Sequence, residues 1–272
     1  MAANGPEPMF TASVSEVYDE LLVPLIFDPY ADELARRLRA LESGSVLEVA
    51  AGTGVVTRRL ASVLPAAVSI TATDLSQAMI DRAMHIGTGR TVEWRQADVM
   101  SMPFAPASFD VVVCQFGVMF FDPKRDAFAE VLRVLRPGGR FLFSVWDGLE
   151  ANEFVDVVAH SLRGAFPDDP PTLIERVPHG YDDTEQIVAD LRAGGFDSQP
   201  SIERIEYVSR AATAEDVATA YCAGTPIRGE LERLRPGGLA EVVAIVTTAL
   251  EARFGSRDLE GRISAQVVGV TK

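Results

Sequence analysis

The sequence predicts an α/β protein built on a doubly wound, mostly parallel sheet. Three observations lead to this prediction. Apolar segments of strand length alternate with helical segments through residue 146. The connections between these segments are short, as in folds made of repeated strand–helix units. The apolar segments are continuous, as at residues 111–113, which indicates strands buried on both faces.

The N-terminal 44 residues are expected to be mainly helical. Residues 1–9 are polar and predict a frayed tail. Apolar residues recur at helical spacing over residues 13–41, and Pro24 and Pro29 divide this stretch into two expected helices. Gly44 follows the second helix, as is common at a helix end.

Strands and helices then follow in turn. Strands are expected at residues 45–50, 68–74, 92–96, 109–115 and 140–146. Helices are expected at residues 55–64, 76–86 and 122–135. Ser76 is a typical N-cap residue for the second of these helices.

Beyond residue 147 the alternation loosens. Helices are expected at residues 153–165, 183–193, from 213 onward, and 239–254, with a Pro- and Asp-rich loop at 166–181. Strands at 202–209 and 262–271 bring the predicted sheet to seven strands. The whole predicts a Rossmann-like fold.

Composition excludes several classes of function. The chain has 272 residues, of which 47% are hydrophobic and 24% charged, as in an ordinary globular protein with a real core. Lys and Arg total 25 against 39 Asp and Glu, which gives a formal net charge of -14. That balance disfavours a nucleic-acid partner and an anionic membrane surface.

Cysteine usage and the apolar runs favour a reduced, cytoplasmic protein. Cys114 lies in an apolar run and is expected to be a small buried hydrophobe. Neither it nor Cys222 belongs to a metal-binding pattern, so no metal site is expected. The start of the chain lacks the features of a signal peptide. The longest apolar run is too short to span a membrane, so no membrane insertion is expected.

A glycine-containing loop indicates a ligand site. Gly52 and Gly54 lie between the first predicted sheet strand and a helix, where backbone N–H groups and positive φ angles suit a bound ligand. Asp74 ends the next strand, 20 residues beyond Gly54, where a carboxylate can accept hydrogen bonds from ribose hydroxyls. An adenosine-containing cofactor, including NAD, fits this pattern. The fingerprint of dinucleotide-binding loops is Gly-x-Gly-x-x-Gly/Ala, and its third small residue would fall at Thr57. The threonine argues against NAD without excluding it.

Five segments in order carry a resemblance to a known family. They are residues 46–54, 74–79, 96–104, 108–113 and 132–140. Together they resemble the class I S-adenosylmethionine-dependent methyltransferases, in the branch similar to the ubiquinone/menaquinone-type enzymes. The resemblance spans roughly residues 45–147. It implies a helical lid at residues 1–44 and a methyltransferase domain at 45–272, with cap insertions at about 148–182 and 211–255.

The resemblance also implies which residues bind S-adenosylmethionine. Asp74 would hold the ribose, Asp98 and Val99 the adenine edge, and Glu48 would organise the loop through backbone N–H groups. The expected cofactor-binding set is Tyr18, Glu48, Ala50, Gly52, Thr53, Gly54, Asp74, Leu75, Met79, Asp98, Val99 and Gln115. Tyr18 is equally well explained as a core residue.

A pocket for the methyl acceptor is expected beside the cofactor. Its expected residues are Phe116, Gly117, Met119, Phe120 and Trp146, with further residues from the two insertions. Such aromatic and Met content suits a small apolar or aromatic molecule. His160 and His179 are the candidate general bases, and no other catalytic residue is indicated.

The sequence therefore predicts methyl transfer from S-adenosylmethionine to a small molecule. The acceptor atom (O, N, C or S) and the oligomeric state stay open. Two alternatives remain at this point: an NAD-dependent oxidoreductase that uses the same crevice, and a non-catalytic S-adenosylmethionine-binding protein.

Overall fold

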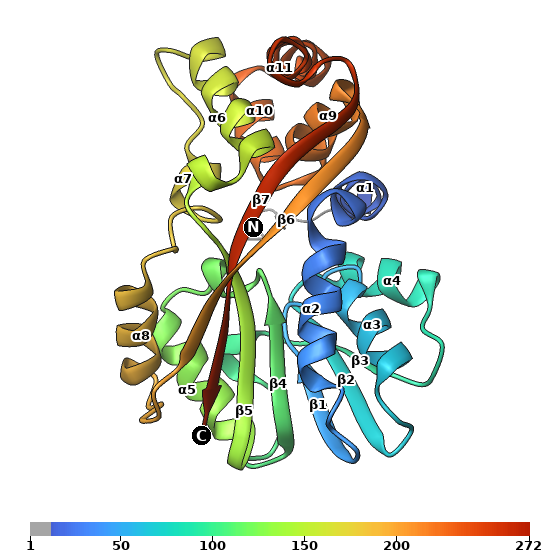
Figure 1. Ribbon diagram of the computed structural model, residues 1–272, viewed down its shortest axis with the longest axis vertical. Coiled ribbons are helices and arrows are strands. Elements are labelled where there is room, and N and C mark those ends of the chain that lie inside the picture. The colour runs from blue at the N-terminus through green and yellow to red at the C-terminus, as the bar shows by residue number, and fades with distance from the viewer. Residues whose placement is uncertain (1–11) are drawn as a thin grey trace, which may run out of the picture.

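The computed structural model describes residues 12–272, and the predicted tail at residues 1–9 lies outside them. Its centre is a seven-stranded sheet in the order β3-β2-β1-β4-β5-β7-β6 (Figure 1). Strands β1 to β5 pair in parallel, and β7 runs antiparallel between β5 and β6. The predicted seven-stranded, mostly parallel α/β fold is confirmed.

The first four strands begin and end close to the predicted positions, whereas β5 begins at Leu135 instead of residue 140 and the two strands at the late-sequence edge are longer than predicted. They are β1 (Gly44–Glu48), β2 (Val68–Asp74), β3 (Glu93–Gln96), β4 (Phe109–Gln115), β5 (Leu135–Trp146), β6 (Ser201–Thr213) and β7 (Arg257–Thr271). Between and around them lie α3 (Val55–Val63), α4 (Gln77–Ile86), η2 (Val99–Ser101), η3 (Val118–Phe120), α5 (Lys124–Val134) and α8 (Thr184–Ala193). Helix α5 packs against α8, while α3 packs against the N-terminal helix α2 (Asp28–Leu38).

Strands β6 and β7 are longer than predicted and reach beyond the sheet. Their antiparallel pairing runs from Ser201 with Gly269 to Thr213 with Arg257, whereas β5 pairs with β7 only as far as Ala265. The extra length was not predicted because its side chains, mostly exposed along β6, lack the continuous apolar pattern of the buried strands.

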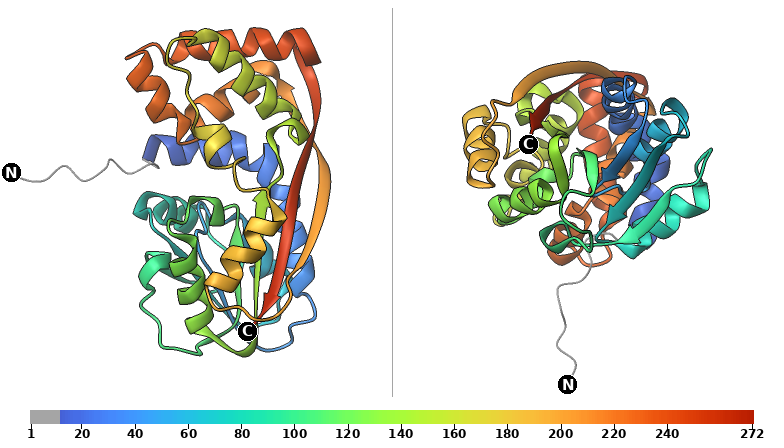
Figure 2. Two further views of the ribbon diagram at one scale, coloured as in Figure 1. Left: turned by 90° about the vertical axis from the view of Figure 1, so that its left-hand side faces the viewer. Right: turned by 90° about the horizontal axis from the view of Figure 1, so that it is seen from below.

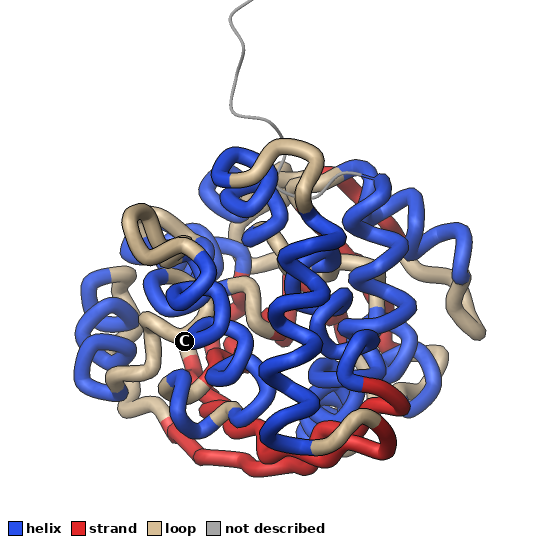
Figure 3. The backbone as a smooth tube through the Cα atoms, turned by 90° about the horizontal axis from the view of Figure 1, so that it is seen from above, coloured by secondary structure: helices blue, strands red, loops and turns tan. Residues whose placement is uncertain are grey.

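A layer of helices lies over the carboxyl ends of the parallel strands. The long β6 and β7 strands carry α9 (Ala214–Gly224), α10 (Ile227–Leu234) and α11 (Leu239–Phe254), and the β5–β6 connection adds η4 (Leu149–Ala151), α6 (Glu153–Ala165) and α7 (Leu173–Arg176). Figure 2 shows this layer stacked on the sheet domain, and Figure 3 shows helices covering the strands from above. No described helix is long and apolar enough to cross a bilayer.

The N-terminal segment differs from its prediction at Pro24. Helix α1 (Ala12–Val17), the π-helix η1 (Tyr18–Phe27) and α2 follow one another without a break, so Pro24 does not divide the segment. In an α-helix the proline ring collides with the carbonyl four residues earlier, and the wider π-turn relieves that contact. Pro29 lies in the first turn of α2, where proline is tolerated.

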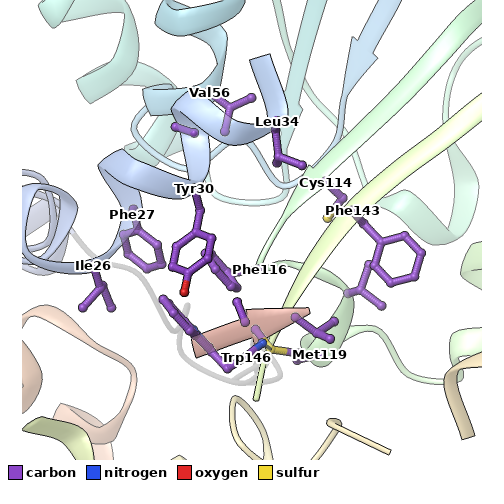
Figure 4. Packing of buried hydrophobic residues seen from close by; sticks show 14 of the residues in the cluster. Ile26, Phe27, Tyr30, Leu34, Val56, Cys114, Phe116, Met119, Phe143 and Trp146 are labelled. Atoms are coloured by element: carbon purple, nitrogen blue, oxygen red, sulfur yellow. Dashed lines mark hydrogen bonds between the residues drawn. The ribbon is translucent and has the colours of Figure 1, made fainter. Parts of the chain in front are cut away.

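An aromatic cluster joins η1 and α2 to the sheet. Phe116 stacks on Trp146 with ring centroids 3.8 Å apart, and Phe27 and Tyr30 pack against both rings (Figure 4). Tyr30 is fully buried and donates a hydrogen bond from its hydroxyl to the Ile205 carbonyl at 3.0 Å. This cluster fixes η1 over the carboxyl ends of β4 and β5. Cys114 and Cys222 are buried free thiols, as expected for Cys114.

Candidate cofactor and acceptor site

A cavity of about 480 Å³ lies at the carboxyl ends of the parallel strands, under η1 and the helical layer. Both halves of the predicted site line it. From the predicted cofactor set the lining includes Tyr18, Ala50, Gly52, Asp74, Leu75, Met79, Asp98, Val99 and Gln115. From the predicted acceptor set it includes Phe116, Gly117, Met119, Phe120 and Trp146. One cavity therefore joins the glycine loop to the aromatic wall.

The glycine loop is tied to the end of β2. The Gly52 N–H donates to Asp74 Oδ2 at 2.8 Å, and Gly52 has a φ of 55°, in the left-handed region. A Cβ at Gly52 would lie 3.5 Å from the Tyr18 hydroxyl, an ordinary contact distance, so it is the positive φ that favours glycine here. Ala50 has a φ of 53°, a conformation uncommon for a residue with a side chain and frequent at functional sites.

Asp74 is held from both sides. Its Oδ1 accepts a hydrogen bond from the Ser76 N–H at 2.8 Å, in addition to the bond from Gly52. Burial raises the pKa of this carboxyl, and the backbone donors act in the opposite direction. The carboxylate is therefore fixed in orientation, and each oxygen keeps a second lone pair for a ligand hydroxyl.

The residues after Asp74 and Asp98 form the expected adenine region. Leu75 is 66% exposed although it is apolar, whereas Met79 is 2% exposed, and both line the cavity. Asp98 Oδ1 accepts from the Met100 N–H at 2.9 Å, which fixes the start of η2. An exposed leucine at the mouth of a cavity is apolar surface that a ligand can cover.

Three residues of the predicted cofactor set do not line the cavity: Glu48, Thr53 and Gly54. Gly54 has a φ of 81°, and a Cβ there would lie 2.7 Å from Trp94 Cη2, so both the backbone conformation and the packing against Trp94 favour glycine. Thr53 is buried, and its hydroxyl has no hydrogen-bond partner among the described residues.

Glu48 supports the loop differently from the prediction. Its Oε2 accepts a hydrogen bond from the Thr57 hydroxyl at 2.5 Å, and no loop N–H within the described chain donates to it. Burial raises the pKa of Glu48 to about 8. Thr57, the residue that broke the dinucleotide pattern, thus binds the buried carboxyl at the base of the loop.

Tyr18 and Gln115 meet the cavity where η1 crosses β4. The ring of Tyr18 lies 5.1 Å from that of Phe27, and burial, with the nearby Asp74 carboxylate, raises its pKa. Gln115 Nε2 donates to the Phe27 carbonyl at 3.3 Å, while its buried Oε1 has no partner among the described residues. A cation or N–H donor of a ligand is the natural partner for that oxygen.

The acceptor end of the cavity is apolar and aromatic. The backbone N–H of Trp146 donates to Met119 Sδ at 3.4 Å, which holds η3 against the end of β5. Several further lining residues come from η1 and the helical layer and were not predicted from the sequence, namely Leu22, Ile26, Phe27, Ile174, Tyr221 and Ile227. Their spacing is that of ordinary helix packing, so no sequence signal separated them from core residues.

The two candidate histidines lie in different places. His160 is exposed, and its Nδ1 lies 2.8 Å from the Asp156 carbonyl oxygen and 3.1 Å from Asp156 Oδ1, outside the cavity lining. His179 lines the cavity, and its Nδ1 lies 2.9 Å from the Asp147 carbonyl oxygen. Burial lowers the pKa of His179 to about 4. Of the two, only His179 is placed to contact a ligand.

The charged side chains that line the cavity are all acidic. Asp74, Asp98 and Asp122 line it, and the lining contains no Lys or Arg among the described residues. No cluster that could hold a metal ion occurs in residues 12–272. The cavity therefore offers no fixed cation to an anionic ligand.

Comparison with known proteins agrees with this geometry. Residues 47–143 match the family model described as "Methyltransferase domain". A ubiquinone/menaquinone biosynthesis C-methyltransferase of Ectopseudomonas mendocina is 39% identical over 101 residues, which cover 36% of this chain and 40% of that protein. The corresponding enzyme of Pseudomonas savastanoi is 31% identical over 153 residues, covering 51% and 60%. A malonyl-[acyl-carrier protein] O-methyltransferase of Hahella chejuensis is 40% identical over 99 residues, covering 36% and 35%.

Solved structures share the fold at low sequence identity. A phosphoethanolamine N-methyltransferase of Haemonchus contortus, solved with S-adenosylmethionine, has a TM-score of 0.59 at 17% identity, covering 97% of this chain and 58% of that one. The [4+2]-cyclase SpnF has a TM-score of 0.54 at 21% identity, covering 90% and 80%. Since a cyclase shares this architecture, the likeness shows the fold alone.

The similarity to curated relatives is confined to the motif region. The matched segments cover 40% and 60% of the two C-methyltransferases, so the chain spans about half the length of the relatives it matches. The matched region contains the glycine loop, Asp74, Asp98 and Gln115, which the structure brings to one cavity. Over residues 47–143 the chain matches a methyltransferase domain, and it is similar there to the ubiquinone/menaquinone biosynthesis C-methyltransferases.

Proposed function

We propose that this chain binds S-adenosylmethionine and transfers its methyl group to a small apolar or aromatic molecule. The observation that carries the proposal is the single cavity that joins the glycine loop to the aromatic wall of Phe116 and Trp146. Methyl transfer is an in-line displacement, so the donor and acceptor must meet in one enclosed space.

The cofactor end of the cavity offers a partner for each part of the molecule. Asp74 would accept hydrogen bonds from the two ribose hydroxyls. Leu75, Met79 and Val99 would cover the adenine ring, and Asp98 would accept from its amino group. Gly52 leaves room for the methionine part beneath Tyr18. These assignments use the side chains that line the cavity, whereas Glu48, Thr53 and Gly54 would support the loop from behind.

The chain's main contribution to the reaction would be positioning and exclusion of water. The bound sulfonium supplies an electrophilic methyl group. Phe116 and Trp146 form a rigid stacked wall at which a flat acceptor can be held. A lining with carboxylates and no lysine or arginine among the described residues favours a cationic cofactor.

Three segments would close over the reactants. The predicted lid contributes Leu22 and Ile26 from η1, within its described part. The insertion at 148–182 contributes Ile174, and the insertion at 211–255 contributes Tyr221. A site enclosed by three segments suits a small acceptor better than a nucleic acid, in agreement with the net charge of -14. The two buried cysteines are free thiols, which suits a protein of the reducing cytoplasm.

Labelled methyl transfer tests the proposal. The purified chain is incubated with methyl-labelled S-adenosylmethionine and size-fractionated cell extract. We expect label in the small-molecule, organic-extractable fraction. Label in acyl-carrier protein or nucleic acid would contradict the proposed acceptor class. Cofactor binding without labelled product in any fraction would favour a non-catalytic protein.

A further inference from the structure

We propose that His179 holds the methyl acceptor through a hydrogen bond from a hydroxyl group to Nε2, and that the acceptor is an uncharged hydroxylated aromatic molecule. This inference rests on the proposed function and names the substrate class of the same cavity. It also gives His179 the task of taking the hydroxyl proton as the methyl group arrives.

The tautomer of His179 follows from its partner. Nδ1 lies 2.9 Å from the Asp147 carbonyl oxygen, which can only accept, so Nδ1 carries the proton. Burial lowers the pKa of the ring to about 4, so the ring is neutral near pH 7. A neutral ring protonated on Nδ1 presents a lone pair on Nε2. The partner of Nε2 must therefore be a hydrogen-bond donor.

The carbonyl that orients His179 is itself held firmly. Asp147 is 4% exposed, and its Oδ2 accepts from Arg204 Nε at 2.6 Å and from the Ser264 hydroxyl at 2.9 Å. Asn152 Nδ2 donates to the same Asp147 carbonyl at 3.3 Å. The Asp147 carboxylate is thus occupied by Arg204 and Ser264. The Asp147 carbonyl holds the His179 ring in one orientation in the cavity wall.

A series of rings leads from the cofactor end to His179. Tyr18 lies over the Gly52 loop and 5.1 Å from Phe27, which lies 5.6 Å from Phe116. Phe116 stacks on Trp146, and the Trp146 and His179 rings are 6.1 Å apart with an interplanar angle of 27°. A flat acceptor lying against the Phe116–Trp146 stack can therefore present to Nε2 the same oxygen that receives the methyl group.

The rest of the cavity narrows the class of acceptor. A carboxylate or phosphate would find no Lys or Arg in the described lining, and the nearby Lys124 ammonium is already bound to the Met119 and Phe121 carbonyls. A neutral amine attacks with its lone pair and keeps its protons during that step, so it needs no base. A hydroxyl must lose its proton when oxygen is methylated, and that proton requires an acceptor such as Nε2.

The proposed step balances as follows. The acceptor oxygen forms a bond to the methyl carbon, and the carbon–sulfur bond breaks with its electron pair passing to sulfur. The hydroxyl proton passes to His179 Nε2 and then to water. The cavity thus holds one positive charge before and after transfer, first on sulfur and then on the imidazole ring, so its carboxylates stay balanced.

Three probes of the same ring test the recognition. Affinities of 2-naphthol, 2-methoxynaphthalene and 2-naphthoate are measured with and without S-adenosylhomocysteine, for the wild type, His179→Asn and His160→Asn. Asparagine can keep the bond to the Asp147 carbonyl but lacks an acceptor at the Nε2 position. His160→Asn is the matched control, because that histidine is exposed outside the cavity.

We expect wild type and His160→Asn to bind 2-naphthol about 3- to 10-fold more tightly than 2-methoxynaphthalene. His179→Asn should lose this preference, and 2-naphthoate should bind most weakly to all three proteins. Equal binding of naphthol and its methyl ether by the wild type, an unchanged preference in His179→Asn, or tightest binding of naphthoate would overturn the inference. Because the series is also run without S-adenosylhomocysteine, failure of that compound to bind counts only against the proposed function.

Turnover tests the proton acceptor separately. Mass spectrometry follows the conversion of 2-naphthol to 2-methoxynaphthalene with S-adenosylmethionine. We expect His179→Asn to lower the rate about 10²-fold, the low end for a general base because a pKa of about 4 makes the ring a weak one, while His160→Asn leaves the rate unchanged. Equal rates in wild type and His179→Asn, or no product from a wild type that binds 2-naphthol, would refute the role as proton acceptor.

Discussion

Replacing Glu48 by glutamine should change how the stability of the fold depends on pH. Glu48 is 1% exposed, and burial raises its pKa from 4.5 to about 8 in the folded chain. Between these values the folded chain binds one more proton than the unfolded chain. Stability contributed by the protonated carboxyl is therefore complete below pH 4.5 and is lost as the pH rises toward 8. Glutamine keeps the size and the acceptor for Thr57 but does not titrate.

His179 sets the pH window in which this effect can be read. Its pKa is lowered from 6.5 to about 4, so its contribution falls as the pH drops below 6.5. Between pH 4.5 and 6.5 the slopes from Glu48 and His179 oppose each other. Above pH 6.5 the Glu48 slope remains, at about 1.4 kcal/mol per pH unit. Over the 1.5 units from pH 6.5 to 8 the wild type should lose roughly 2 kcal/mol of unfolding free energy from this carboxyl.

Urea unfolding followed by tryptophan fluorescence measures this loss. Trp94 packs beside Gly54, and Trp146 forms part of the aromatic wall, so both report on the site. Unfolding free energies are measured at pH 6.5, 7.2 and 8 for the wild type and for Glu48→Gln. We expect the wild type to lose stability across the series and the variant to lose roughly 2 kcal/mol less. Parallel slopes in the two proteins would refute the assignment of a protonated, buried Glu48.

Two further predictions concern the loop. Gly54→Ala places a Cβ 2.7 Å from Trp94 Cη2, so it should lower the unfolding free energy by about 1–3 kcal/mol more than Gly138→Ala, whose Cβ meets nothing within 4 Å at a similar φ. Equal losses in urea unfolding would show that Trp94 does not require glycine. Asp74→Ala should weaken S-adenosylmethionine binding by about 1–3 kcal/mol in calorimetry, because ribose hydroxyls lose an acceptor. The exposed Asp81→Ala is the control, and unchanged affinity in Asp74→Ala would remove Asp74 from the site.

The parallel half of the fold could be predicted from sequence because its signals are local. Continuous apolar strands, the Ser76 cap and the glycine loop each report their own backbone conformation, and the structure has β1 to β5 as the expected parallel strands. The π-helix around Pro24 was not predictable in this way. Its wider turn is stabilised by packing of Phe27 against Phe116 and Trp146, which are far away in the chain.

The candidate site was predicted well where a backbone position determines the lining. Asp74 and Gln115 end their strands and Asp98 follows β3 closely. All three line the cavity. Gly54 was predicted to contact the cofactor but does not line the cavity. A glycine favoured by its backbone conformation and a neighbouring tryptophan has the same sequence signature as one required by a ligand. The cap residue His179 could not be separated from His160 by sequence, because the insertion is placed by the long β6 and β7 strands rather than by local pattern.

Equilibrium binding decides whether the cavity takes S-adenosylmethionine or NADH. Isothermal titration of the purified chain with S-adenosylmethionine, and separately with NADH, compares the two cofactors that fit the Gly52 and Asp74 arrangement. The cavity and the match of residues 47–143 to a methyltransferase domain predict one-to-one binding of S-adenosylmethionine at micromolar concentration and no binding of NADH. Micromolar binding of NADH without binding of S-adenosylmethionine would contradict the account.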